Sequence, residues 1–294
     1  MLSRRFSGTA VLIAVALAVG SASVAAPATQ TSTLVAIRAA HHPNFDRLVF
    51  EFTGPLPTTY SVTRVPQIIG DGSGLPIPVA GDALLAVRFY PAAGHDDSGH
   101  GTYGPIRRTY PLPGLIEVAN SGDFEAVLSF GVGLATSTSV RTFTLTNPSR
   151  VVVDLDTTFP TITARAYFLD RNRFATGIEP YVRAIARPVI PPAVAHGALQ
   201  RLFAGPTPAE RAAGLEFIGS DATGFTKLSI VNGIARVRLV GGCNSHGSTF
   251  TIADEIFPTL RQFPSVRWVK IYDTAGRTGN PTGPVDSIPD CLNP

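Results

Sequence analysis

The sequence predicts two domains, an all-β antiparallel sandwich followed by a small α+β domain, from three observations. The chain has 294 residues and is rich in turn formers, with 28 Gly and 25 Pro, which favours many short strands. Apolar residues alternate with a period of two from Leu34 to Asp156, whereas helical stripes appear only after about Ala164. The length suffices for two modest cores, and the 44% hydrophobic share excludes a disordered chain.

The first 26 residues have the pattern of a secretory signal peptide. Arg4 and Arg5 precede an apolar run, Ala10–Val19, and then the small residues of Gly20–Ala26. The run is shorter than the roughly 20 apolar residues of a membrane span, so we expect no transmembrane segment in the mature chain. Removing both arginines lowers the net charge from +3 to about +1, which does not indicate nucleic acid as a partner.

The chain has two cysteines, Cys243 and Cys291. In an exported protein, such a pair is most simply one disulfide. A zinc site that includes Cys243 and His246 is the alternative, which two free thiols would favour. Because no cysteine precedes Cys243, we expect no lipid anchor and therefore a secreted protein that is not a lipoprotein.

Residues 34–157 form the predicted sandwich domain. Five sets of alternating apolar residues mark its strands: Leu48, Phe50 and Phe52; Leu85, Val87 and Phe89; Phe124, Leu128 and Phe130; Phe143 and Leu145; Val151, Val153 and Leu155. Asp123 and Glu125 share a face, as paired catalytic carboxylates would. With Phe124 pointing inward, however, both are expected at the surface.

A linker at residues 158–163 leads to the predicted α+β domain, residues 164–294. A helix over Ala193–Ala204 ends at Gly205-Pro206, and Thr207 to Glu210 form a capping box. Asn232-Gly233 predicts a hairpin that pairs Val231 with Ile234 and, further along, Thr226 with Leu239. A second helical stripe runs from Ile252 to Phe263, and Pro258 is expected to kink it.

Within the predicted α+β domain, residues 164–294, the part from Ala164 to Tyr272 resembles a GerMN domain of bacterial envelope proteins, and the disulfide-tied tail extends it. The resemblance rests on Tyr167–Asp170, Ala198–Thr207, the hairpin Val231–Leu239 and Thr259–Val266. The first segment is similar to the AMIN-like domain of exported bacterial proteins, through Phe45–Phe52, Tyr103–Pro105, Asp123–Glu125, Gly131–Leu134 and Pro148–Asp154. These resemblances imply a β-sandwich that localises proteins to the cell wall and a module that builds envelope assemblies. Neither family supplies catalytic residues.

The most reactive local sequence is the loop His95–His100. His95, Asp97 and His100 could ligate a divalent metal, but polar residues of a glycine-rich loop usually face water. No Gly-x-Ser-x-Gly motif occurs in the chain, so a serine hydrolase is not indicated. No cofactor, catalytic residue or metal site is therefore assigned, and the binding residues remain unassigned.

The sequence thus predicts an exported, non-catalytic envelope protein. Its expected partners are cell-wall glycan, peptidoglycan or envelope proteins, contacted through aromatic and arginine side chains. The alternative is a cell-wall hydrolase or metal-dependent enzyme that uses the loop His95–His100.

Overall fold

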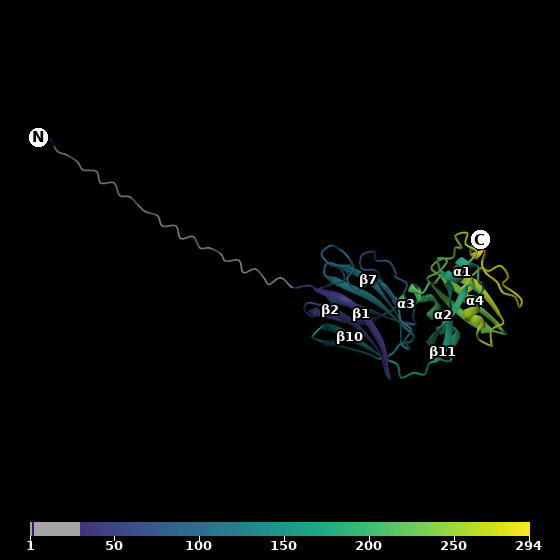
Figure 1. Cartoon of the computed structure of the whole chain (residues 1–294), viewed down its shortest axis with the longest axis horizontal. Coiled ribbons are helices and arrows are strands. Elements are labelled where there is room, and N and C mark those ends of the chain that lie inside the picture. The colour runs from purple at the N-terminus through teal and green to yellow at the C-terminus, as the bar shows by residue number, and fades with distance from the viewer. Residues whose placement is uncertain (1, 3–29) are drawn as a thin grey trace.

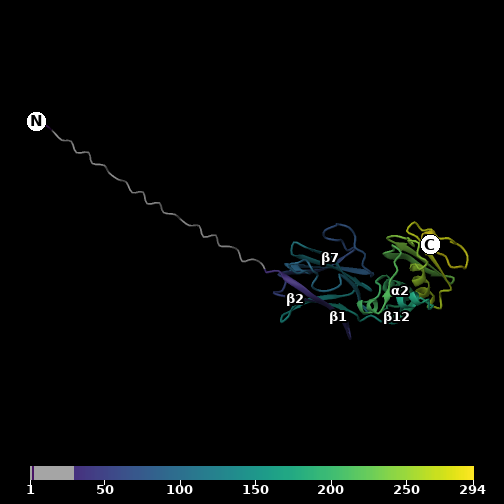
Figure 2. The same cartoon turned by 45° about the horizontal axis from the view of Figure 1, so that its top comes forward.

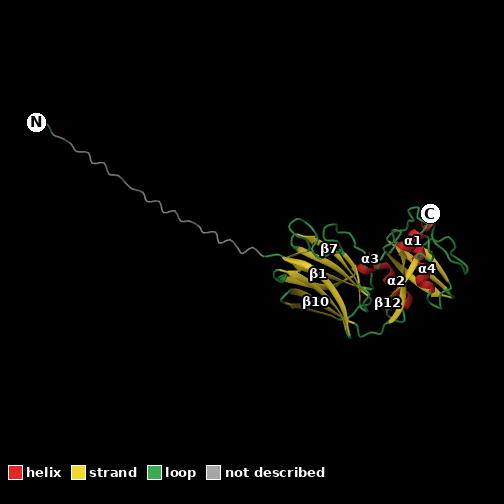
Figure 3. Ribbon diagram, viewed as in Figure 1, coloured by secondary structure: helices red, strands yellow, loops and turns green. Residues whose placement is uncertain are grey.

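The computed structural model describes residue 2 and residues 30–294, and shows a β-rich half joined to a half that contains the helices (Figures 1 and 3). We call residues 32–157 the first half and residues 158–294 the second half. The predicted signal peptide, residues 1–26, lies outside the described residues except for residue 2.

The first half contains two five-stranded sheets. One has the order β5-β1-β2-β10-β9 and the other has the order β3-β4-β8-β7-β6. The strands are β1 (Ser32–His42), β2 (Phe45–Thr53), β3 (Thr59–Val65), β4 (Ala83–Tyr90), β5 (Ala92–Ala93), β6 (Arg107–Thr109), β7 (Leu115–Phe124), β8 (Val127–Leu134), β9 (Val140–Leu145) and β10 (Ser149–Asp156). All pairs are antiparallel except that of β1 with the short β5.

Aromatic side chains fill the space between the two sheets. Phe50 of β2 lies with its ring centroid 4.9 Å from that of Phe89 on β4 and 5.2 Å from that of Phe130 on β8. All three are buried, as the period-two alternation predicts. Contact between rings from opposite sheets identifies the first half as a β-sandwich, so the all-β prediction is correct here.

The prediction for Phe124 is wrong, because its side chain is 72% exposed. β7 and β8 join through a two-residue turn at Glu125 and Ala126, whose φ angles are 50° and 59°. A register irregularity between Asn120 and Gly122 shifts the alternation, so that Asp123 lies opposite buried Leu128. Residues directly opposite share a face, so Asp123 points toward the core side and Phe124 points outward.

The second half combines two three-stranded sheets with four α-helices (Figure 2). The sheets have the orders β12-β11-β13 and β14-β15-β16, and β15 and β16 are parallel. The elements are β11 (Ile162–Asp170), α1 (Arg171–Thr176), β12 (Val182–Val189), α2 (Val194–Phe203), α3 (Pro208–Ala212), β13 (Leu215–Glu216), β14 (Gly224–Val231), β15 (Ile234–Val240), α4 (Ile252–Arg261), β16 (Trp268–Tyr272) and the 3₁₀ turn η1 (Asp290–Leu292). β11 therefore includes Ile162 and Thr163, which the sequence analysis assigned to the linker.

The predicted hairpin forms, with one correction to its register. Asn232 and Gly233 have φ angles of 52° and 78°, and Val231 pairs with Ile234 as expected. An irregularity between Thr226 and Ser229 then shifts the pairing, so that Thr226 lies opposite Arg238 instead of Leu239. The shift coincides with a positive φ of 54° at Lys227, which the sequence pattern does not reveal.

Helix α4 runs without interruption from Ile252 to Arg261 and contains Pro258, so the residue does not end the helix. Thr251 and Asp254 form a capping box at its start, a second instance of the motif that Thr207 and Glu210 form in α3. A proline removes one helical donor, here the one that would bond the carbonyl of Asp254. The remaining turns are held by the buried apolar face of the helix.

Glu255 of α4 is a fully buried carboxyl group. It accepts hydrogen bonds from the backbone N–H of Leu169 on β11 at 2.9 Å and of Ile218 at 3.1 Å. Burial raises the pKa of Glu255 well above its ordinary value, and the two N–H groups oppose this effect only in part. A single acidic side chain thus joins α4 to β11 and to the segment after β13.

The predicted disulfide between Cys243 and Cys291 is present. It fastens the C-terminal tail to the loop after β15, where Ser245 N–H also donates to the carbonyl of Cys291 at 2.7 Å. The same tail covers Lys270 of β16, which is fully buried and donates to the carbonyls of Asn280 and Thr282. The tail is therefore part of the second half's packing.

Reducing the disulfide should lower the free energy of unfolding by up to about 4 kcal/mol, because the bond closes a loop of 48 residues in the unfolded chain. The expected result is a lower midpoint in reductant for the unfolding of the second half, followed by the fluorescence of Trp268. The Cys243→Ser, Cys291→Ser double variant should reproduce the shift without reductant. An unchanged midpoint in both experiments would contradict the prediction.

Replacing Glu255 by Gln should flatten the pH dependence of stability. A carboxyl group whose pKa is raised on folding contributes stability that is fully present below its ordinary pKa of 4.5 and is lost as pH rises through the folded value. Urea unfolding at about pH 5 and about pH 8 should show that the wild-type protein loses more stability than the Glu255→Gln variant. Equal losses would show that the buried carboxyl group does not titrate in this range.

Candidate functional site

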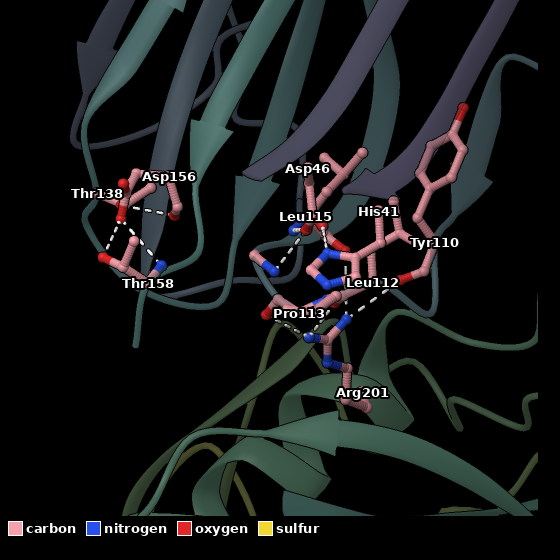
Figure 4. A network of polar contacts seen from close by, with 11 residues as sticks. His41, Asp46, Tyr110, Leu112, Pro113, Leu115, Thr138, Asp156, Thr158 and Arg201 are labelled. Atoms are coloured by element: carbon pink, nitrogen blue, oxygen red, sulfur yellow. Dashed lines mark hydrogen bonds and ion pairs between the residues drawn. The ribbon is translucent and has the colours of Figure 1, made fainter. Parts of the chain in front are cut away.

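Arg201 of α2 is the main polar contact between the two halves (Figure 4). Its side chain is buried, and its guanidinium donates to the backbone carbonyls of Leu112 at 2.7 Å, Tyr110 and Pro113 at 3.1 Å, and Leu115 at 3.3 Å. These carbonyls belong to the connection between β6 and β7 and to the first residue of β7. One cation from the second half therefore satisfies four acceptors of the first half.

Asp46 of β2 holds the same segment from the opposite side (Figure 4). Its buried carboxylate accepts from the backbone N–H of Gly114 at 2.6 Å and Leu115 at 2.9 Å, and lies 2.8 Å from Nδ1 of His41. Burial and, to a smaller extent, the charge of Arg187 lower the pKa of Arg201 to about 9, although Asp46 opposes both effects. The guanidinium therefore stays protonated at neutral pH.

Further contacts between the halves surround this pair. The Thr109 hydroxyl donates to the carbonyl of Ala204, and Ala204 packs against Ile116 and Ala135 of the first half. His196 Nε2 lies 2.8 Å from Asp82 Oδ1 across the same boundary. These contacts fix the position of α2 against the sandwich.

A pocket of about 560 Å³ opens beside this contact and is lined by both halves. We call it the central cleft. The first half contributes Pro78, Ala80, Arg107 and Glu117; the second half contributes Arg171, Phe203–Pro206, Arg211, Ala212, Gly214–Phe217 and Thr223. Its volume lies within the range of small-molecule binding sites.

Three arginines and two glutamates give the central cleft a formal charge of +1. Buried Glu117 accepts from the N–H of Ala80 at 2.7 Å and pairs with Arg107, which also donates to the carbonyl of Pro78. Burial raises the pKa of Glu117, and Arg107 opposes that effect. Arg171 lies 3.2 Å from Glu216.

Arg211 is the cleft arginine that keeps its donors available. Within residues 30–294 it makes no ion pair at 4 Å or less, whereas Arg107 and Arg171 each have one. Burial lowers the pKa of Arg211, while Glu117 and Glu210 raise it. An arginine stays charged at neutral pH, so Arg211 offers a cation and several N–H donors to a ligand.

Aromatic rings and an unpartnered amide complete the site. Phe203 lies 5.5 Å from both Phe217 and Phe225 between ring centroids. An adjoining pocket of about 170 Å³ shares the lining residues Ala80, Phe203 and Thr223 with the cleft, and Gln200 also lines it. Gln200 is 6% exposed, and its buried Nε2 has no hydrogen-bond partner in the described chain. Buried donors are nearly always satisfied, so this amide is suited to an acceptor supplied by a ligand.

The structure does not gather His95, Asp97 and His100 into one site. His95 Nδ1 lies 2.8 Å from Asp123 Oδ2, which also accepts from the N–H of Gly94. His100 and Asp97 are exposed. Across the described part of the chain, no three His, Cys, Asp or Glu side chains are grouped as metal ligands would be. Asp123 therefore supports the fold of this loop, which corrects its interpretation as a surface residue.

Neither the central cleft nor the role of Arg201 was predicted from the sequence. Arg201 lies seven positions after Val194 and three after Ala198, on the apolar stripe of the helix. A cation on a buried stripe is the one signal that could have identified it. The cleft residues come from seven separated segments, and nothing in the sequence connects them.

Comparison with known families finds an AMIN-like domain at residues 32–157, which agrees with the resemblance of the first half. No curated protein and no solved structure matches the chain. Within the described residues, no helix is both long enough and apolar enough to cross a membrane. The GerMN resemblance of residues 164–294 stays an expectation.

Replacing Arg201 by Met should destabilise the contact between the halves. The variant keeps most of the side-chain volume but leaves buried carbonyls without a donor, at a cost of roughly 2–4 kcal/mol. Limited proteolysis should then cut between β10 and β11 faster than in the wild-type protein. Arg165→Met, at an exposed position on β11, serves as the control. Equal cutting rates in both variants would contradict a role of Arg201 in joining the halves.

Proposed function

We propose that the protein is exported and acts as a non-catalytic component of the cell envelope, where it binds cell-wall material or envelope proteins. The AMIN-like domain at residues 32–157 carries this proposal, because such domains are associated with binding to peptidoglycan or the envelope. The disulfide between Cys243 and Cys291 supports it, because stable disulfides are typical of compartments outside the cytosol.

The second half is proposed to be a GerMN-like module that places this binding function within an envelope assembly. It contributes most of the central cleft and holds it against the sandwich through Arg201. Arginine and aromatic side chains at one site are suited to peptide or glycan ligands, which combine polar groups with apolar faces.

A cell-wall hydrolase that uses the loop His95–His100 is the competing proposal. Its strongest support is the contact between His95 and Asp123, because a carboxylate can orient a histidine for proton transfer. Against it, Asp96 accepts from the N–H groups of Ser98 and His100 at 2.9 Å, a bonding pattern typical of a structural loop.

Mature protein incubated with purified cell wall should sediment with it and release no soluble fragments. Excess soluble wall fragments should reduce sedimentation, whereas an unrelated insoluble polysaccharide should retain no protein. Fragment release that disappears in both the His95→Ala and the His100→Ala variants would support the hydrolase instead. A protein that stays in solution would contradict wall binding.

A further inference from the structure

We propose that the central cleft binds the carboxylate end of a short peptide of the cell wall. This inference rests on the proposed function and adds the binding site and the chemical class of the ligand. Three features carry it: an arginine with available donors in the cleft, a buried amide without a partner in the adjoining pocket, and a cleft floor of aromatic and aliphatic side chains.

Arg211 is the residue proposed to bind the carboxylate. Arg107 is held by Glu117 and by the carbonyl of Pro78, and Arg171 lies against Glu216, so both are already engaged. Arg211 has no such ion pair in the described structure, although it lines the same pocket. A planar guanidinium binds a carboxylate through two parallel hydrogen bonds, which gives direction as well as attraction.

Gln200 is suited to the carbonyl oxygen of the same ligand. Its Nε2 is buried beside the cleft and has no partner within residues 30–294, so a ligand carbonyl that reaches it satisfies a donor that the protein leaves unpaired. Such a match favours a ligand with an acceptor over one without it, because a buried donor left unpaired costs free energy.

The apolar floor and the formal charge of the cleft favour a ligand that has an aliphatic side chain and one negative charge. Phe203, Leu215 and Phe217 provide an apolar surface that can cover a small aliphatic side chain. The formal charge of +1 balances a single carboxylate, whereas buried Glu117 and nearby Glu216 oppose a doubly charged phosphate. A pocket of about 560 Å³ takes a few residues of a peptide, not a folded domain.

The test is calorimetric titration of the full mature protein with soluble disaccharide-peptide fragments of purified cell wall. The matched probes are the same fragments with their carboxyl groups converted to amides, inorganic phosphate, and a linear peptide of protein type with a free C-terminus. The proposal expects binding of the free-acid fragments and at least a tenfold weaker affinity for the amides. Equal binding of acid and amide forms would overturn it.

One variant in the cleft, one in the adjoining pocket and one control test the residues. Arg211→Gln should weaken fragment binding about tenfold or more, and Gln200→Leu about two- to tenfold. Arg165→Gln, an exposed arginine that does not line the cleft and makes no ion pair in the described chain, should bind as the wild-type protein does. Gln200→Leu should keep or raise the thermal midpoint, because it removes a buried unpaired donor. A loss of affinity together with an intact midpoint would separate ligand contact from a structural role.

The remaining outcomes separate this inference from the proposed function. If the wild-type protein sediments with cell wall and Arg211→Gln does so equally well, the cleft is not the wall site and the function stands. If fragments bind in the cleft but the protein does not sediment with cell wall, the peptide-binding cleft stands and the proposed function fails. Preferential binding of phosphate or of the protein-type peptide would overturn the assigned ligand class.

Discussion

The buried guanidinium of Arg201 is the interaction on which the arrangement of the two halves depends. It replaces water at four carbonyls in the segment that leads into β7, while Asp46 engages the N–H groups of the same segment from within the sandwich. Because both charges are buried, each needs the intervening backbone to be in place. The position of α2, and with it the cleft wall at Phe203–Pro206, follows from this constraint.

The surface therefore has two kinds of candidate site, one formed by a single half and one formed where the two halves meet. The loop His95–His100 lies on one half alone and is organised by its own backbone contacts. The central cleft exists only where the halves meet, and its arginines have unequal bonding, since two are paired and one is available. In the adjoining pocket, the amide of Gln200 is buried without a partner. Uneven satisfaction of polar groups is more typical of ligand sites than of purely structural contacts.

Much of the fold could be predicted from the sequence, because local patterns determine it. Period-two alternation located the core strands around Phe50 and Phe89, the Asn232-Gly233 turn located the hairpin, and the two cysteines located the disulfide. The errors arose where a single backbone irregularity shifts a register. The irregularity between Asn120 and Gly122 moved Phe124 to the surface, and the one beside the positive φ angle at Lys227 displaced Thr226 by one residue. L-residues with such angles leave little trace in a hydrophobic pattern.

The central cleft could not be predicted from sequence patterns. Arg107, Arg171 and Arg211 belong to three separate elements, and the docking of the halves brings Arg107 to the same pocket as the other two. Arg201 was the one residue with a readable signal, since a cation on an apolar helical stripe needs a buried partner. That partner is main chain, which has no sequence signature.

The use of main-chain carbonyls as the partner of Arg201 also bears on how this protein can diverge. Carbonyl oxygens are present whatever side chains the segment Tyr110–Leu115 carries. Substitutions of those side chains therefore leave the acceptors of Arg201 in place. The arginine has no such freedom, because every other residue type lacks its fork of donors. A different module docked at this position would need its own donor for these four carbonyl oxygens. The contact therefore depends on the identity of one side chain in the second half, but only on the path of the backbone in the first half.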